Sequence, residues 1–286
     1  MEFALFIMMG FSISMLSGFF GIGGGFVLTP VLMLMGFSPI EAISTSLLYT
    51  IGTSISGVVA HYKMKNILWK QALIIGTSGI VATQLAYPFV EWLDSTGLDE
   101  TVIPAMYLLL LSYFAFKMLK QFTGGSDGMH LSNSIFPLMI IGLLGGFLST
   151  ALGVGGGFII VPLLISFLGF PSRNAVATSL TSVIFIVSAG FLTYAINIPI
   201  HYDTGFLLIA GAIFGSQLGA KATSYVKNAT IQRLLGILYI CTMASLIINM
   251  TEYTVLGLVV LACYTLAMNI FMFFRIFKHD VVESNG

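Results

Sequence analysis

The stretch Gly21-Ile22-Gly23-Gly24-Gly25-Phe26 decides the fold of this chain, because it returns 132 residues later as Gly153-Val154-Gly155-Gly156-Gly157-Phe158. Each copy is followed four residues later by a proline, Pro30 in the first and Pro162 in the second. Three adjacent glycines break a helix, and inside strongly apolar sequence such a break is tolerated only where protein or a water-filled cavity surrounds the backbone. Two breaks at corresponding positions of two halves are typical of a transporter's binding site.

The composition indicates a membrane protein. Of the 286 residues, 57% are hydrophobic and 8% are charged, and the mean hydropathy is +1.02. Soluble domains, in contrast, carry about 25% charged residues. Apolar stretches of about 18 residues or more recur along the chain, each long enough to cross a bilayer. We therefore predict an all-α polytopic membrane protein in contact with membrane lipid, and the net charge of zero indicates no nucleic-acid partner.

The similarity between the two halves extends beyond the glycines. At an offset of 133, residues 42–47 (Ala-Ile-Ser-Thr-Ser-Leu) match residues 175–180 (Ala-Val-Ala-Thr-Ser-Leu), and Gln84 matches Gln217. The chain is thus expected to contain two copies of one unit. We predict a first transmembrane repeat over residues 1–120, a polar linker over 121–133, a second transmembrane repeat over 134–250, and an extra C-terminal transmembrane helix with its tail over 251–286.

Charges and turn residues divide the sequence into apolar segments that we expect to be helical. Their approximate bounds are 3–20, 24–36, 41–60, 67–91, 101–120, 135–152, 156–168, 174–196, 203–225, 231–249 and 253–277. Segments 24–36 and 156–168, with about 13 residues or roughly 20 Å of helix each, are shorter than the roughly 30 Å hydrocarbon core. Each repeat is therefore predicted to start with a glycine-broken, re-entrant helical hairpin whose tip lies within the membrane.

The distribution of charges predicts the orientation of these segments, because cytoplasmic loops carry an excess of Lys and Arg. Three lysines place the loop near residue 65 in the cytoplasm, and the acidic loop at 91–100, which lacks Lys and Arg, lies outside. By the same rule the N-terminus is outside and the C-terminus is cytoplasmic. The turn after segment 41–60 is then cytoplasmic and the turn after its partner 174–196 is external, so the two repeats are predicted to be inverted.

Two helix N-termini, beginning at about Gly24 and Gly156, are predicted to meet near one cavity. Their first N–H groups have no partner within the helix and lie at the positive end of its dipole, so they can bind a small anion without a permanent cation in the bilayer. The alternative is that the glycines only allow close packing of helices, as small residues do in membranes. A nucleotide site is not expected, because no Lys-Ser/Thr pair follows the glycines.

Matched polar residues extend this candidate site. The hydroxyl groups of residues 45–46 and 178–179 either donate to an anion or bond back to carbonyl groups of their own helix. The two matched glutamines either contact the substrate or tie two helices together. The candidate substrate-binding residues are Gly23, Gly24, Gly25, Phe26, Thr45, Ser46, Gln84, Gly155, Gly156, Gly157, Phe158, Thr178, Ser179 and Gln217.

The sequence gives little support to other functional classes. Ser56 and His61 are five residues apart and would not share a helix face, so we expect no enzyme active site and no catalytic residue. Cys241 and Cys263 lie in apolar segments without the spacing of a metal or redox site, and we predict neither a metal nor a cofactor. Segment 253–277 lies outside the repeats, and it either contacts a second copy in a homodimer or simply returns the C-terminus to the cytoplasm.

The paired Gly-x-Gly-Gly-Gly-Phe…Pro elements, each followed by Gly-Phe and an Ala-x-x-Thr-Ser-Leu stretch, resemble the TauE/SafE sulfite exporters, also called the toluene-sulfonate uptake permease family. The resemblance covers essentially the whole chain. It implies an inner-membrane secondary transporter that exports a small sulfur-containing anion, such as sulfite, sulfoacetate or another organosulfonate, by alternating access.

This resemblance leaves parts of the mechanism open. No ATP-binding module is evident, so coupling is expected to be to a proton or sodium gradient, or to the gradient of the anion itself. A passive small-anion channel is the alternative function. The second copy departs from the first where Ala177 replaces Ser44 and where Pro171-Ser172 replaces Ser38-Pro39, so the two halves are not expected to contribute equally.

Overall fold

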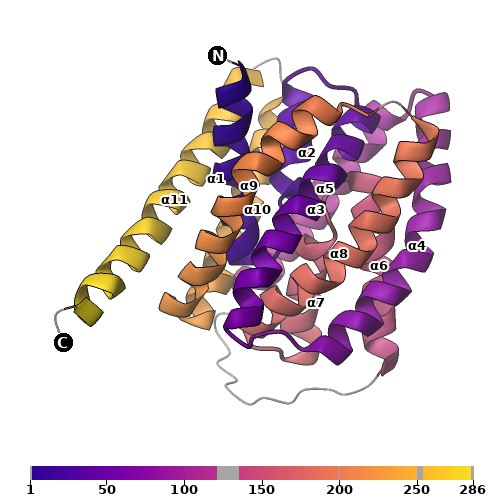
Figure 1. Cartoon of the computed structure of the whole chain (residues 1–286). Helices are drawn as coiled ribbons and strands as arrows, with labels where there is room; N and C mark the ends of the chain where they lie inside the picture. Colours follow the sequence, from indigo (N-terminus) through magenta and orange to yellow (C-terminus); the bar gives the residue numbers. More distant parts are fainter. Residues whose placement is uncertain (1, 121–134, 199, 250–253, 285–286) are drawn as a thin grey trace.

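This computed structural model describes residues 2–120, 135–198, 200–249 and 254–284, and the polar linker predicted at 121–133 lies outside these ranges. The described residues form helices with short connections (Figure 1). The helices are α1 (Glu2–Phe20), α2 (Gly25–Leu34), α3 (Pro39–Lys63), α4 (Trp69–Ser95), α5 (Asp99–Lys120), α6 (Ile135–Leu152), α7 (Gly157–Leu168), α8 (Ser172–Asn197), α9 (Tyr202–Ala222), the 3-10 helix η2 (Thr223–Tyr225), α10 (Asn228–Asn249) and α11 (Thr254–Ser284). The predicted all-α fold is confirmed for the part of the chain that the structure describes.

Nine of the described helices are long and apolar enough to cross a membrane, as a polytopic membrane protein requires. The two shorter apolar helices, α2 and α7, follow the glycine motifs. They contain 10 and 12 residues. At about 1.5 Å per residue they span only about 15 and 18 Å. A long helix and a short helix are thus joined at each glycine motif: α1 to α2, and α6 to α7.

The start of α3 shows how local sequence sets a helix boundary. The hydroxyl oxygen of Ser38 accepts a hydrogen bond from the N–H of Glu41 (3.4 Å), and Oε2 of Glu41 accepts one from the N–H of Ser38 (3.0 Å). This capping box satisfies two N–H groups at the helix start, and Pro39 supplies a backbone angle suited to the first turn. Glu41 therefore caps its own helix at one end of the molecule.

The equivalent helices α3 and α8 run in opposite directions. At one end of the molecule, Oε1 of Glu41 near the start of α3 lies 3.2 Å from Nε2 of His201, which follows the end of α8. At the other end, the side-chain amide of Asn174 near the start of α8 donates to the carbonyl oxygen of Asn66, which follows the end of α3 (3.0 Å). This antiparallel arrangement is the one that inverted repeats require.

The two predicted repeats pack closely against each other: α1 of the first lies along α9 of the second, and α6 of the second lies along α4 of the first. Glycines line both interfaces. A Cβ on Gly18 would meet the carbonyl oxygen of Ser216, and a Cβ on Gly146 would meet that of Gly79. Small residues allow helix backbones to approach this closely in membranes. In Figure 1, α11 lies at one side of the molecule next to α1 and α9, and α4 and α6 lie at the opposite side.

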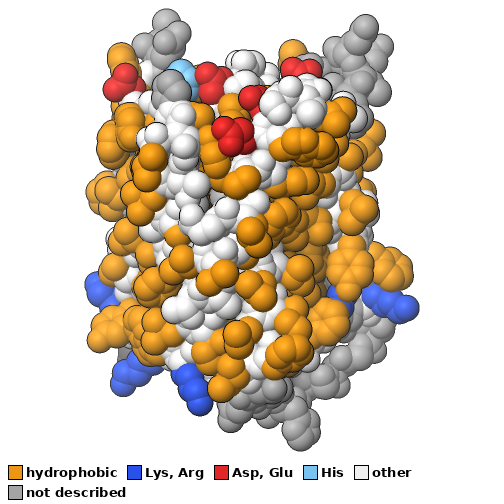
Figure 2. Space-filling model, turned by 90° about the vertical axis from the view of Figure 1, so that its right-hand side faces the viewer, with side chains coloured by type: hydrophobic (Ala, Val, Ile, Leu, Met, Phe, Trp, Pro, Cys, Tyr) orange, Lys and Arg blue, Asp and Glu red, His pale blue; other side chains and the backbone are white. Residues whose placement is uncertain are grey.

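Charged side chains lie at the two ends of the molecule and differ in sign between them. Figure 2 shows Asp and Glu at one end, Lys and Arg at the other end, and a belt of hydrophobic side chains between. Large hydrophobic side chains are exposed on several of the long helices, including Leu109 on α5 and Phe214 on α9. Such a belt between two charged ends is the surface of a multi-pass membrane protein.

Candidate functional site

The two glycine motifs meet in the interior of the molecule. We call residues 21–24 the first glycine turn and residues 153–156 the second glycine turn, and both are fully buried. A Cβ on Gly23 would lie 3.5 Å from the Cα of Gly155, and the methyl group of Thr50 packs against both glycines. Because Thr50 lies near the middle of α3, the turns meet about halfway between the two ends of the molecule.

The geometry of these turns requires glycine for two reasons. Gly24 and Gly156, which precede α2 and α7, have φ angles of 79° and 73°, a region that residues with a side chain rarely adopt. The next residues, Gly25 and Gly157, begin the two helices and lie against the opposite turn. A Cβ on either of them would meet a carbonyl oxygen of that turn. The triple glycine therefore lets two backbones cross without side chains between them.

The N-terminus of α2 is already bonded to a side chain. The N–H of Gly25 donates to Oγ1 of Thr50 over 3.0 Å. The hydroxyl group of Thr53 donates to the carbonyl oxygen of Gly23 over 2.8 Å. Both threonines belong to α3, so this helix holds the first glycine turn and satisfies the first N–H group of α2.

The N-terminus of α7 differs, because α8 lacks the matching hydroxyl group. At the offset of 133, Thr50 corresponds to Val183, whose side chain cannot accept a hydrogen bond. Among the described residues, the N–H groups of Gly157 and Phe158 have no hydrogen-bond partner, whereas at the start of α2 only the N–H group of Phe26 lacks one. These donors lie at the positive end of a helix dipole, which is where helix N-termini bind anions.

Buried hydroxyl groups accompany these free N–H groups. Ser149 on α6 packs against the second glycine turn, since a Cβ on Gly156 would lie 3.2 Å from the Cβ of Ser149. A buried polar group without a partner costs about 1–3 kcal/mol, so such groups are candidate ligands of a bound molecule. The buried hydroxyl oxygens that lack a partner in the described structure belong to Ser17, Thr45, Ser46, Ser54, Ser149 and Thr150. Within the described ranges, no cluster of His, Cys, Asp or Glu that could hold a metal ion accompanies them.

Matched serines of the two repeats form different bonds. Ser179 on α8 donates to the carbonyl oxygen of Gly21 over 3.0 Å. The carbonyl oxygen of Gly153, the equivalent of Gly21, instead accepts from the hydroxyl group of Thr29 over 3.1 Å. Ser46, the equivalent of Ser179, has no partner in the part of the chain that the structure describes. The two halves of the candidate site therefore differ in their hydrogen bonds.

Other predicted site residues pack near the turns or form hydrogen bonds between helices. Phe26 and Phe158 stack on each other, with ring centroids 5.2 Å apart and an angle of 25° between the rings. Oγ1 of Thr178 accepts a hydrogen bond of 3.2 Å from the N–H of Leu68, so it connects α8 to the start of α4. The aromatic pair packs α2 against α7, and Thr178 has a structural partner that its equivalent, Thr45, lacks.

The two matched glutamines lie in different surroundings. Gln84 is exposed on α4, and its amide donates to Oγ1 of Thr193 on α8 over 3.3 Å. Thr193 lies ten residues beyond Val183, which packs against the first glycine turn. Ten residues correspond to about 15 Å along a helix. The structure therefore places Gln84 away from the turns and ties it to a neighbouring helix, and it places Gln217 half-buried on α9.

Sequence reasoning missed the threonines that bond the glycine turns, which are Thr29, Thr50 and Thr53. Apolar residues occupy the matching positions of these threonines in the second copy, so a comparison of the two copies does not identify them. Ser17 and Ser149 match each other at the offset of 132, so the same comparison could have found them.

Comparison with known proteins finds relatives over most of the chain. A family model described as sulfite exporter TauE/SafE matches residues 6–246. A probable membrane transporter protein of Methanocaldococcus jannaschii is 28% identical over 247 residues, covering 81% of this chain and 90% of the relative. The probable membrane transporter protein YunE of Bacillus subtilis is 26% identical over 260 residues, covering 84% of this chain and 95% of the relative. No solved structure matches the chain significantly.

Proposed function

The chain belongs to the sulfite exporter TauE/SafE family, and from this premise we propose that it is a secondary transporter that exports a small sulfur-containing anion. Sulfite, sulfoacetate and other organosulfonates are the candidate substrates. The family and the names of the relatives point to a membrane transporter and not to an enzyme. The chemistry of the second glycine turn supports an anionic substrate.

The observation that carries this proposal is the group of unpaired donors at the second glycine turn. The N–H groups of Gly157 and Phe158 lie at the positive end of α7, and the hydroxyl group of Ser149 lies beside the turn. A sulfite or sulfonate group presents three oxygens that accept hydrogen bonds. Neutral donors bind such a group without the cost of burying a Lys or Arg side chain inside the membrane.

Alternating access would follow from an exchange of conformation between the inverted repeats. Both glycine turns are buried in this structure, so neither is exposed at an end of the molecule. Two polar contacts between the repeats lie at opposite ends: Glu41 with His201, and Asn174 with the carbonyl group of Asn66. In this mechanism, opening the site toward one end of the molecule breaks the polar contact at that end, while the contact at the opposite end is kept.

The proposal includes an orientation in the cell's inner membrane. The end that carries Lys and Arg in Figure 2 faces the cytoplasm, and the acidic end faces outward, in agreement with the positive-inside rule. The N-terminus is then external and the C-terminus cytoplasmic. A proton or sodium gradient, or the gradient of the anion, supplies the driving force for transport. That α11 contacts a second copy in a homodimer stays a prediction.

Uptake and counterflow in proteoliposomes test the proposal, with labelled sulfite and a small panel of sulfonates. Saturable uptake that accelerates when unlabelled anion is loaded on the far side is expected, and it would also identify the substrate. Conductance without saturation or counterflow would indicate a passive small-anion channel instead. No flux of any of these anions through folded protein would overturn the proposed substrate class.

A further inference from the structure

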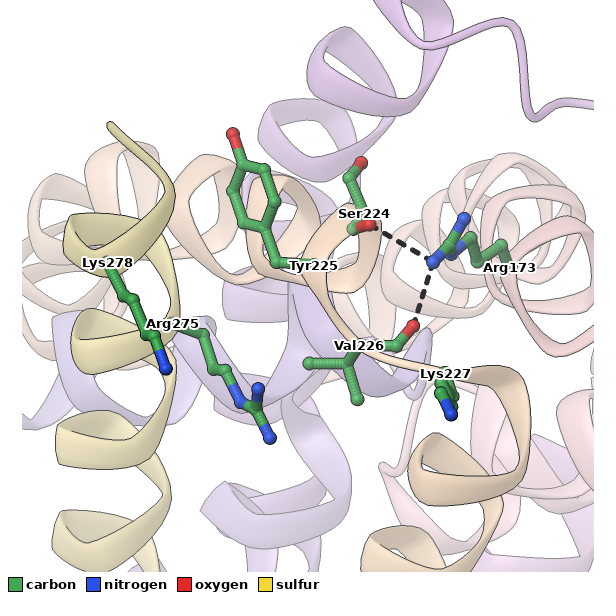
Figure 3. A pocket seen from close by; sticks show the side chains of 7 residues that line it. All are labelled: Arg173, Ser224, Tyr225, Val226, Lys227, Arg275 and Lys278. Atoms are coloured by element: carbon green, nitrogen blue, oxygen red, sulfur yellow. Dashed lines mark hydrogen bonds between the residues drawn. The ribbon is translucent and has the colours of Figure 1, made fainter. Parts of the chain in front are cut away.

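A pocket lined by basic side chains lies at the Lys- and Arg-rich end of the molecule (Figure 3). We call it the cationic pocket, and its basic residues are Arg173, Lys227, Arg275 and Lys278. They come from the start of α8, the connection between η2 and α10, and α11. Among the described residues that line this pocket there is no carboxylate, so none of them neutralises its positive charges, which favour an anion.

One wall of the cationic pocket is fixed by hydrogen bonds to backbone carbonyl groups. Arg173 donates from Nε to Thr223 over 2.8 Å, and from one terminal nitrogen to Val226 over 2.8 Å and to Ser224 over 3.1 Å. Carbonyl groups hold the guanidinium in place without removing its charge. Figure 3 shows Arg173 on one side of residues 224–227, and α11 with its two basic residues on the other side.

The exposed surface of α11 beside this pocket is apolar. Ile270, Phe274 and Phe277 are 69%, 67% and 64% exposed. Their spacing of four and three residues places them on one face of the helix. Arg275 and Lys278 each follow one of the phenylalanines directly, so the apolar face borders the basic side chains. A ligand that fits both features has a negative group and long hydrocarbon chains.

We propose that the cationic pocket binds the phosphodiester headgroup of an anionic phospholipid, whose acyl chains lie along the exposed apolar face of α11. Basic pockets between membrane helices bind lipid headgroups of this kind. A small soluble anion would use the positive charge but not the adjoining apolar face. The bound lipid connects α11, which lies outside the repeats, to α8 and to the connection before α10. The inference does not depend on which substrate the protein carries.

Lipid binding to the purified full-length protein in detergent tests this proposal. Native mass spectrometry would count retained phosphatidylglycerol and phosphatidylcholine, and thermal unfolding would be followed with each lipid added. We expect phosphatidylglycerol to be retained and to raise Tm, and phosphatidylcholine to do neither. The variant R275Q/K278Q is expected to bind phosphatidylglycerol roughly 30-fold more weakly, because two basic contacts are removed.

A matched control removes two other positive charges from the same end of the molecule. Lys63 and Lys70 are exposed and do not line the cationic pocket, so K63Q/K70Q should keep the affinity of the unchanged protein. Should R275Q/K278Q fold poorly, K227Q gives the same comparison with one charge removed. Equal binding of both lipids, or equal loss in the control, would overturn the proposal. An equal rise in Tm with inorganic phosphate at matched ionic strength would assign the pocket to a free anion.

Discussion

The hydroxyl group of Ser179 donates a hydrogen bond of 3.0 Å to the carbonyl oxygen of Gly21, so that a helix of the second repeat holds the glycine turn of the first. The reverse contact does not exist in the described structure: the hydroxyl group of Thr29 donates to the carbonyl oxygen of Gly153, and Ser46 has no partner. The two glycine turns have nearly the same motif but are thus held by different hydrogen bonds, and only the first N–H group of α2 is bonded to a side chain.

Ser46→Ala and Ser179→Ala are expected to act on different quantities. If Ser46 donates to the substrate, its loss should raise KM roughly ten-fold or more, because hydrogen bonds to charged groups contribute about 1.5–3 kcal/mol. Ser179→Ala should instead lower the free energy of unfolding by about 1–3 kcal/mol, since it leaves a buried carbonyl group unpaired. Transport kinetics in proteoliposomes and thermal unfolding in detergent separate the two effects. Equal changes in KM would contradict the assignment.

Val183→Thr is expected to inhibit transport, because it gives α7 a threonine hydroxyl group equivalent to the one that bonds the N-terminus of α2. A threonine at this position is nearly the same size as valine and matches Thr50, so its oxygen should accept from the N–H of Gly157. The donor is then no longer available to the anion, and KM should rise while Tm is kept or raised. The reciprocal variant, Thr50→Val, should lower Tm and leave KM unchanged. A normal KM in folded Val183→Thr would place the anion elsewhere.

Gly156→Ala tests whether the second glycine turn needs its backbone angle and its close packing. The φ angle of 73° strains a residue with a side chain, and the Cβ would lie 2.9 Å from the carbonyl oxygen of Gly145. We expect loss of transport together with a lower Tm. Gly97→Ala is the control, because Gly97 has a φ of 67° but no atom within 4 Å of the added Cβ. That control should lose about 1 kcal/mol of stability and keep its transport rate.

The proposed orientation predicts which side of the membrane each charged end faces. In a background with Cys241 and Cys263 replaced by serine, Ser95→Cys and Ser224→Cys introduce exposed thiols at opposite ends of the molecule. A membrane-impermeant maleimide should label the thiol at position 95 in intact cells. It should reach the thiol at position 224 only after the cells are permeabilised. Labelling in the opposite order would reverse the topology.

The sequence was sufficient to predict the helices, because hydrophobic length and the glycine breaks are local signals. Segment 135–152 coincides with α6, and segments 24–36 and 156–168 contain the short helices α2 and α7. The antiparallel course of α3 and α8 was likewise expected from a few charges. The helix bounds depend on residues that are near one another in the chain. The helix directions follow from which side of the membrane the charged loops face.

The unequal bonding of the two glycine turns could not be predicted from the repeat. A match between two copies identifies what they share, whereas Thr50 and Thr29 act because their counterparts Val183 and Val161 lack a hydroxyl group. The match of Gln84 with Gln217 likewise contained no information on burial, and the structure places Gln84 on the surface. Which residues face each other across helices depends on packing between distant segments.

The pairing of α1 with α9 constrains how the protein is assembled in the cell. The ribosome delivers α1 first, but the glycine-lined face of α9 that receives it enters the membrane only after most of the chain has been synthesised. Until then, the face of α1 that later packs against α9 is turned toward lipid. The candidate site between the two glycine turns can therefore form only after α7 and α8 of the second half have entered the membrane.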